Sequence, residues 1–135
     1  MNHRLLYLDS SAIIKVIVPE SGSEELLALL AQWPNRISSE LARTEVLRAL
    51  RRGEVTAAQF RRGQKILDRI GLVPIDSRIV NEAALLKPVA LRTLDAIHLA
   101  TAISIRGDLA GIVTYGTRLA TAAAAAKLSV YAPGA

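Results

Sequence analysis

Short apolar segments alternate with longer segments of helical periodicity along the chain, and this alternation limits the folds open to it. The short segments predict strands at 4–8, 36–39, 72–76, 111–115 and 129–132. Between them, apolar residues recur three and four positions apart, which predicts helices at 10–18, 21–33, 39–53, 56–71, 77–87, 93–107 and 117–128. Strands that alternate with helices favour an α/β fold in which helices flank a central, mostly parallel sheet.

Single residues predict where several of these elements begin or end. Pro74 indicates that the strand at 72–76 lies at a sheet edge, because proline lacks the amide that a central strand would use. Hydroxyl side chains are predicted to cap four helices, and these residues are Thr56, Ser77, Thr93 and Thr117. The chain has 135 residues, a length that suits one domain, so we expect residues 1–135 to form a single domain.

The composition excludes several classes of protein. The chain has no cysteine, which rules out disulfides and thiolate metal sites. The absence of cysteine is compatible with the reducing cytoplasm, where we expect the protein to act. We expect no signal peptide and no association with membranes, since no apolar run approaches the roughly 20 residues that span a bilayer.

The excess of positive charge lies in one segment. Residues 43–69 contain eight basic and three acidic residues, which accounts for the whole net charge of +5, because the rest of the chain has nine of each. Such a patch is typical of a surface that meets phosphates, although a pair of solvated, arginine-rich helices is an equal alternative. The candidate phosphate contacts in this segment are Arg48, Arg51, Arg52, Arg61 and Arg62.

Three acidic residues are predicted to meet at one edge of the sheet. Asp9 directly follows the first strand, while Glu45 and Asp95 lie in the early turns of helices. In open α/β sheets, ligands bind at the edge formed by the carboxyl ends of the strands, where the following helices also begin. Carboxylates that converge at this edge repel one another unless a cation neutralises them. Hard oxygen ligands suit Mg²⁺ or Mn²⁺. Taken singly, Asp9 and Asp95 could instead stabilise helix starts, and Glu45 could pair with Arg48.

Four blocks of the sequence match, in order, the motif blocks of a known family: "YLDSSAIIK", "SSELARTEVLRAL", "LRTLDAIHLATA" and "IVTYGTRLA". On these blocks the chain resembles the PIN-domain family, and within it the VapC toxins of bacterial toxin–antitoxin pairs. The resemblance implies a three-layer PIN-like fold, Mg²⁺-dependent endoribonuclease activity, a homodimer and inhibition by a VapB-type antitoxin. It also implies that Asp9, Glu45 and Asp95 are the catalytic and metal-binding acids, and that Ser11 helps to order the site.

One position departs from the family pattern. Gly116, in "VTYGTRL", stands where the family usually has a further acid. The nearest acid, Asp108, precedes the last-but-one strand and is expected at the opposite edge of the sheet. The alternative function is therefore an inactive or weakly active PIN-like module that binds RNA or its antitoxin.

Other residues leave alternatives open or exclude them. His98 follows Asp95 by one turn, so it either contacts the carboxylates or is a structural histidine near the core. Glu40 is a rival to Glu45, although the motif favours Glu45. Ser10 has no His and Asp pattern that would support a catalytic triad. A receiver-type phosphoryl-transfer domain would need an Asp after a middle strand and a later Lys, and the chain does not clearly supply this pair.

Overall fold

The computed structural model describes residues 4–135, which form a five-stranded, fully parallel sheet with helices on both faces. The strands are β1 (Leu5–Leu8), β2 (Arg36–Ser39), β3 (Gly71–Val73), β4 (Leu109–Val113) and β5 (Val130–Tyr131). The helices are α1 (Ser10–Ile17), α2 (Ser23–Gln32), α3 (Leu41–Arg52), α4 (Ala57–Asp68), α5 (Ser77–Leu85), α6 (Thr93–Ser104) and α7 (Thr117–Ala125), with a 3-10 turn, η1 (Arg106–Asp108), before β4. The predicted α/β class and parallel sheet are confirmed.

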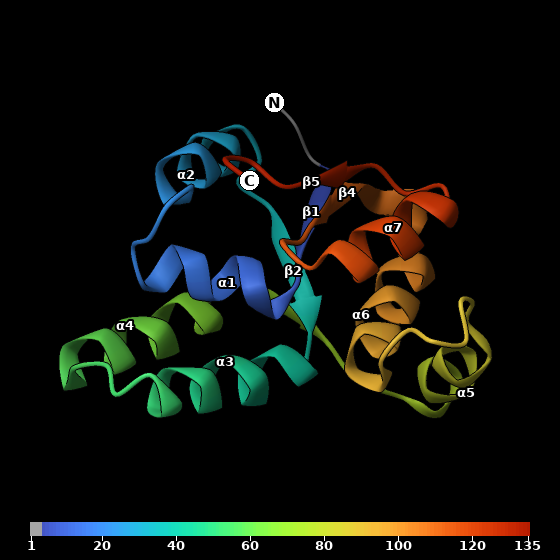
Figure 1. The fold of residues 1–135 in the computed structure, drawn as a ribbon, viewed down its shortest axis with the longest axis horizontal. Helices are drawn as coiled ribbons and strands as arrows, with labels where there is room; N and C mark the ends of the chain where they lie inside the picture. The colour runs from blue at the N-terminus through green and yellow to red at the C-terminus, as the bar shows by residue number, and fades with distance from the viewer. Residues whose placement is uncertain (1–3) are drawn as a thin grey trace.

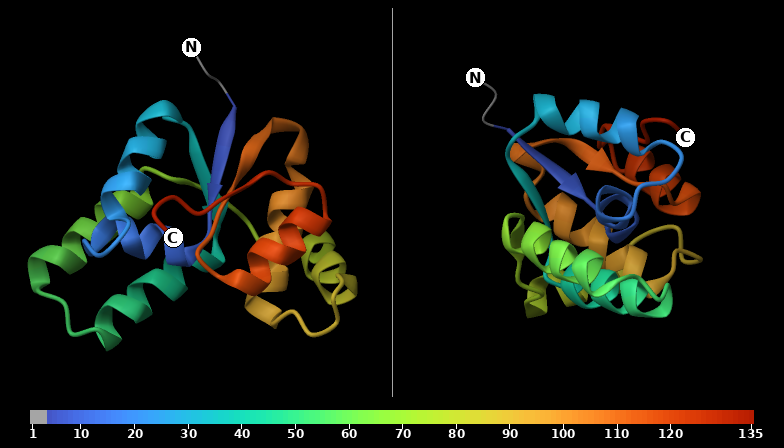
Figure 2. Two further views of the ribbon diagram at one scale, coloured as in Figure 1. Left: turned by 45° about the horizontal axis from the view of Figure 1, so that its top comes forward. Right: turned by 90° about the vertical axis from the view of Figure 1, so that its left-hand side faces the viewer.

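The sheet separates two layers of helices. In Figure 1, α1–α4 lie on one side of the strands and α5–α7 on the other, and the left view of Figure 2 shows the same division. Successive strand residues face opposite sides of a sheet, so β1 contributes to both cores. Leu6 and Leu8 pack in the cluster formed with α1–α4, whereas Tyr7 packs with α6 and α7, beside Leu99 and Leu119.

β1 lies at the centre of the sheet, whose order is β3-β2-β1-β4-β5. It pairs with β2 on one side and with β4 on the other, and the amide of Asp9 continues the second pairing to the Val113 carbonyl at 3.1 Å. Because every strand runs in the same direction, the residues that follow β1 and β4 meet at one edge. The first turns of α1 and α7 also lie there.

Strand boundaries differ from the prediction most in β3 and β4. β3 ends at Val73, just before Pro74, and lies at the sheet edge as predicted. β4 begins at Leu109 rather than Gly111, because its pairing with β1 starts at the Leu5–Leu109 pair.

The prediction of helix caps is right for one of four residues. Thr56 caps α4, accepting a hydrogen bond from the Gln59 amide at 3.1 Å. Ser77 is wrong because the preceding residue, Asp76, has the extended backbone of a cap and accepts from the Ile79 amide at 2.9 Å.

Thr93 and Thr117 are also wrong as caps. Each is already the first helical residue, and the cap positions before them belong to Arg92 and Gly116. Neither Arg92 nor Gly116 makes a side-chain cap to its helix, so the starts of α6 and α7 lack this contact. No helix in residues 4–135 combines the length and apolar character needed to cross a bilayer.

Candidate active site

Asp9 lies at the junction of β1 and α1, where it is almost fully buried. Its Oδ1 accepts hydrogen bonds from the Ala12 amide at 3.0 Å and the Ser11 hydroxyl at 2.6 Å, and its Oδ2 accepts from the Thr114 hydroxyl at 2.5 Å. The Ser11 oxygen in turn accepts from the Tyr115 amide at 3.1 Å. Asp9 therefore caps α1, and the same contacts fix its carboxylate at the carboxyl edge of the sheet.

Thr114 was missed by the sequence reasoning, although it contacts Asp9 directly. It is fully buried after β4, and besides donating to Asp9 its oxygen accepts from the Gly116 amide at 3.0 Å. A signal was present in the sequence. Thr114 follows an apolar strand as abruptly as Asp9 does, and a polar side chain at that place needs a partner.

Glu45 lies in the second turn of α3 and is half-buried. Its Oε1 accepts from the Ser10 hydroxyl at 2.6 Å and lies 2.7 Å from Nε2 of His98. The structure thus gives Glu45 partners on α1 and α6 instead of the alternative partner, Arg48, on its own helix. The rival acid Glu40 is exposed at the start of α3.

His98 satisfies both of the alternatives left open by the sequence. It is a buried histidine, 2% exposed, whose Nδ1 lies 2.7 Å from the hydroxyl of Tyr7, with the two rings edge to face at 5.8 Å between centroids. It also contacts a carboxylate of the cleft, Glu45. Since Ser10 and Glu45 both approach the same nitrogen of His98, the arrangement differs from a catalytic triad.

The charges of two of the carboxylates, Asp9 and Glu45, act on the third, Asp95. Burial raises the pKa of the Asp95 carboxyl, and the negative charges of Asp9 and Glu45 raise it further, against the opposing effects of His98 and Arg92. Burial also acts to raise the pKa of Glu45, but the hydrogen bonds from His98 and Ser10 outweigh it and lower that pKa. Of Glu45 and Asp95, Asp95 is therefore the carboxylate whose negative charge is less well compensated by its surroundings.

The chemistry of this cleft fits a divalent cation. Carboxylate oxygens are the donors that Mg²⁺ and Mn²⁺ prefer, and the raised pKa of Asp95 reports negative charge that a cation would neutralise. As they stand, no three Asp, Glu, His or Cys side chains within residues 4–135 form a group that could hold an ion. An ion would therefore need these carboxylates to lie closer together than they do here, or water molecules to bridge some of them to it.

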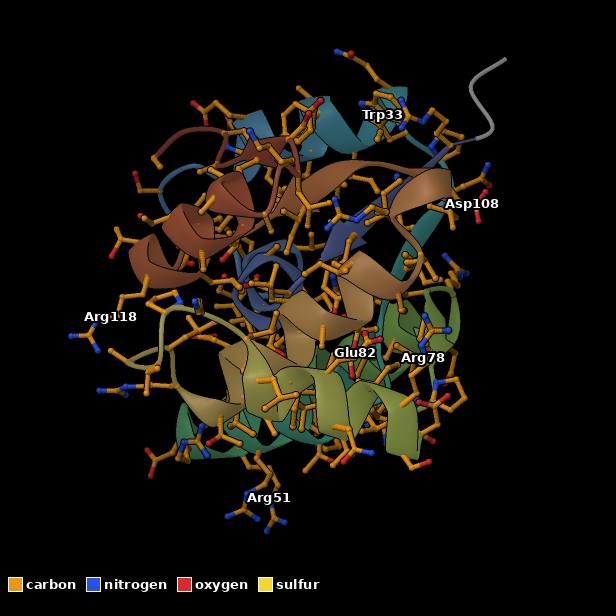
Figure 3. All side chains as sticks on the ribbon, turned by 90° about the vertical axis from the view of Figure 1, so that its right-hand side faces the viewer. Trp33, Arg51, Arg78, Glu82, Asp108 and Arg118 are labelled. Carbon is orange, nitrogen blue, oxygen red and sulfur yellow. The ribbon has the colours of Figure 1, made fainter. Side chains whose placement is uncertain are left out.

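Gly116 leaves room for a side chain. Its backbone has φ −82° and ψ 119°, which any residue adopts, and a Cβ there would lie 3.6 Å from Oγ1 of Thr114 and 4.0 Å from Cβ of Leu119. Asp108 does not replace the missing acid, because it lies in η1 before β4. Figure 3 shows Asp108 far from Arg118, which lies in the first turn of α7 after Gly116.

The candidate RNA contacts are exposed on two neighbouring helices. They are Arg48, Arg51 and Arg52 on α3, and Arg61 and Arg62 on α4. The three on α3 line a surface hollow of about 280 Å³, and Figure 3 shows Arg51 extending away from the body of the protein. One other basic residue of the segment, Arg43, is engaged in an ion pair with Asp68 at 2.9 Å.

A second exposed feature was not expected from the sequence. Apolar side chains of α5 and of the loop before α6 line a hollow of about 590 Å³. Two of them are largely in solvent, Leu85 at 84% and Val89 at 94% exposure. Exposed apolar groups gathered in this way mark contact surfaces.

Comparisons with known proteins agree with this geometry. The family model described as "PIN domain" matches residues 6–125. Ribonuclease VapC46 of Mycobacterium tuberculosis is 43% identical over 129 residues, covering 95% of this chain and 97% of that protein. A toxin–antitoxin complex from Klebsiella pneumoniae contains a chain that superposes with a TM-score of 0.71 at 25% identity, covering 95% of this chain and 97% of that one. VapC20 of Mycobacterium tuberculosis, a Sarcin-Ricin loop cleaving toxin, superposes with a TM-score of 0.75 at 13% identity, covering 95% and 99%, which shows the shared fold.

Proposed function

Because the chain belongs to the PIN-domain family, we propose that it is a Mg²⁺- or Mn²⁺-dependent endoribonuclease, the toxin of a type II toxin–antitoxin pair. The observation that carries the proposal is the Asp9 carboxylate held by hydrogen bonds at the carboxyl edge of the sheet, together with the effect of its charge and that of Glu45 on Asp95. A relative that is 43% identical over nearly the whole chain and is named a ribonuclease supports RNA as the substrate. We further propose that residues 1–135 form one PIN domain that acts in the cytoplasm.

In this proposal each side chain of the cleft has a distinct task. Asp9 and Asp95 would hold the ion, with Glu45 holding it directly or through water. When bound, the ion would stabilise negative charge on the scissile phosphate and lower the pKa of a water molecule. Ser11 and Thr114 keep the Asp9 carboxylate in place through their hydrogen bonds.

The first prediction tests cleavage itself. The purified chain is expected to cut single-stranded RNA when Mn²⁺ or Mg²⁺ is added and to stop when a chelator removes the ion. The matched control is Asp9→Asn, which keeps a side-chain oxygen to cap α1 but lacks the charge. Equal cleavage by the two proteins would point to a contaminating nuclease and contradict the proposal.

A non-catalytic binding module is the second candidate, and Gly116 favours it because the cleft lacks a fourth acid at that position. This candidate predicts RNA or antitoxin binding with no cleavage in either metal. Binding and cleavage measured on the same preparation separate the two functions.

The exposed arginines of α3 are proposed to bind the RNA backbone. Binding affinity should fall with salt by a logarithmic slope of about −0.7 for each phosphate contact, as for other single-stranded nucleic acids. Replacing Arg51 and Arg52 by Ala should flatten this slope by roughly 1.4 if each contacts one phosphate. The slope is measured by fluorescence anisotropy over a range of salt concentrations.

A control double variant removes the same charge elsewhere. Arg78→Ala with Arg106→Ala changes two exposed arginines outside the basic segment. It should leave the slope as in the wild type. If both double variants flatten the slope equally, the effect comes from net charge and the patch on α3 has no special role.

Two protein partners complete the proposal. A second copy of the chain is proposed to cover the apolar hollow beside Leu85 and Val89, forming a homodimer. A VapB-type antitoxin is proposed as the inhibitor, and the similar chain in the toxin–antitoxin complex from Klebsiella pneumoniae supports it.

A further inference from the structure

We propose that His98 is a positioning residue, held by Tyr7, that binds one oxygen of Glu45 and leaves the other oxygen facing the cleft. The importance of this oxygen for cleavage rests on the proposed function. The orientation itself rests on contacts within the protein and can be tested without metal or RNA.

The hydrogen bonds to Glu45 are one-sided. The Ser10 hydroxyl and Nε2 of His98 both approach Oε1, at 2.6 Å and 2.7 Å. Within the described part of the chain, Oε2 receives neither of these bonds. A carboxylate held by one oxygen can offer the other to a cation or a water without losing its support.

The two contacts of His98 select one tautomer. The ionised Glu45 carboxylate can only accept hydrogen bonds, so the nitrogen that faces it, Nε2, must carry a proton. In the neutral ring Nδ1 is then an acceptor, and the group 2.7 Å from it is the Tyr7 hydroxyl, which can donate. Burial raises the pKa of Tyr7, so this hydroxyl keeps its proton. Tyr7 thereby determines which nitrogen of His98 is directed to Glu45 as a donor.

The support behind this chain of hydrogen bonds is rigid. Tyr7 lies in the central strand and is fully buried, and His98 is 2% exposed. Glu45 comes from α3, in the opposite layer of helices from α6. His98 therefore reaches around the end of the sheet and fixes a side chain of one layer against a strand and a helix of the other.

His98 also lies one helical turn after Asp95, so both belong to the same face of α6. The spacing in "DAIH" thus places Asp95, one of the three acids, beside His98, which positions a second acid, Glu45. This gives a reason for a buried, hydrogen-bonded histidine at this position of α6, since an apolar residue there would leave Tyr7 and Glu45 without this partner.

Nitrogen-15 NMR of the imidazole tests the tautomer in metal-free protein. The chain has two histidines, and His3→Asn, a change outside the described residues, leaves His98 as the only signal. We expect a protonated Nε2 and an unprotonated, hydrogen-bonded Nδ1. Adding Tyr7→Phe should shift the equilibrium towards the Nδ1-protonated form, because the donor to Nδ1 is lost. A wild-type ring protonated on Nδ1 alone would overturn the proposal, because Nε2 could not donate to Glu45.

A pair of amide variants separates positioning from packing. In His98→Gln the amide nitrogen reaches about the place of Nε2 and can still donate to Glu45, whereas the shorter His98→Asn keeps a polar atom near Tyr7 only. Loss of a group that orients a metal ligand typically costs about 10–100-fold, so kcat should fall by this factor in the Asn variant and much less in the Gln variant. KM for RNA should stay unchanged in both.

A purely structural role makes the opposite prediction. If His98 only supports the core, its contact with Tyr7 is what matters, and His98→Asn keeps this contact. His98→Asn should then be both more stable and more active than His98→Gln. Thermal melts of the two variants accompany the kinetics for this reason. Equal or reversed activities would overturn the proposal. If the wild type does not cut RNA, the proposed function fails, while the NMR result still decides whether His98 positions Glu45.

Discussion

Asp95→Asn is expected to abolish most of the stabilisation by Mn²⁺ and to lower RNA cleavage by at least about 100-fold, since a direct ligand should matter no less than the groups that orient it. An ion that binds only the folded state adds about 2.7 kcal/mol at a hundredfold excess over its Kd. Without the Asp95 charge the site binds the ion more weakly, so the melting temperature should rise much less when Mn²⁺ is added. Differential scanning fluorimetry with and without Mn²⁺ measures this rise.

The same substitution is expected to raise the melting temperature of the metal-free protein at neutral pH. Burial and the charges of Asp9 and Glu45 raise the pKa of Asp95 in the folded state above its unfolded value. The protonated Asp95 carboxyl therefore contributes stability that is fully present below its unfolded pKa. This contribution is lost as the pH rises through the folded pKa of Asp95. Asn stays neutral at every pH. The difference in melting temperature between Asp95→Asn and the wild type should therefore be small in acid and grow towards neutral pH.

Asp108→Asn is the control for both effects. Asp108 is an exposed acid in η1, before β4, away from the carboxyl edge of the sheet. Replacing Asp108 should leave unchanged the rise in melting temperature that Mn²⁺ causes. An equal rise in wild type, Asp95→Asn and Asp108→Asn would remove the case for Asp95 as a ligand.

Gly116→Asp is expected to increase cleavage and to lower the metal concentration for half-activity by about tenfold, the effect of ~1.4 kcal/mol of added binding free energy. A carboxylate here would join the cleft beside Thr114 and help to hold a second ion, and two ions about 3.5–4 Å apart can stabilise both the attacking and the leaving oxygen. The backbone of Gly116 has negative φ, and a Cβ there would make only ordinary van der Waals contacts, so a side chain fits without a clash. Metal titrations of the cleavage rate give the half-activity concentration.

Gly116→Asn is the matched control because Gly116 is also the cap residue of α7. Asp and Asn cap a helix about equally well, each gaining a few tenths of a kcal/mol over Gly. In metal-free thermal melts Gly116→Asn should therefore show a small gain, and Gly116→Asp a smaller gain or none, because its charge is repelled by the neighbouring carboxylates. Only the Asp variant should change the metal dependence. A well-folded Gly116→Asp protein with the metal dependence of Gly116→Asn would show that this position is no ligand site.

The sequence by itself determined the architecture and the edge of the sheet where the acids gather. The spacing of apolar residues within each segment indicates whether it is a strand or a helix and which of its residues are buried. This spacing is a local property of the chain. Asp9 was found because a buried strand ends at Leu8 and a helix begins at Ser10, so its position depends on its neighbours alone. Thr114 carried the same local signal and could have been found in the same way.

Only the tertiary structure decided which partners these side chains have. Glu45 and His98 are 53 residues apart, and Tyr7 and His98 are 91 apart, so no local pattern reports their contacts. The sequence left His98 as either a core residue or a cleft residue, and its contacts with Tyr7 of β1 and Glu45 of α3 make it both at once. The apolar hollow beside Leu85 was equally invisible, because helical periodicity shows that a face is apolar without showing whether another element covers it.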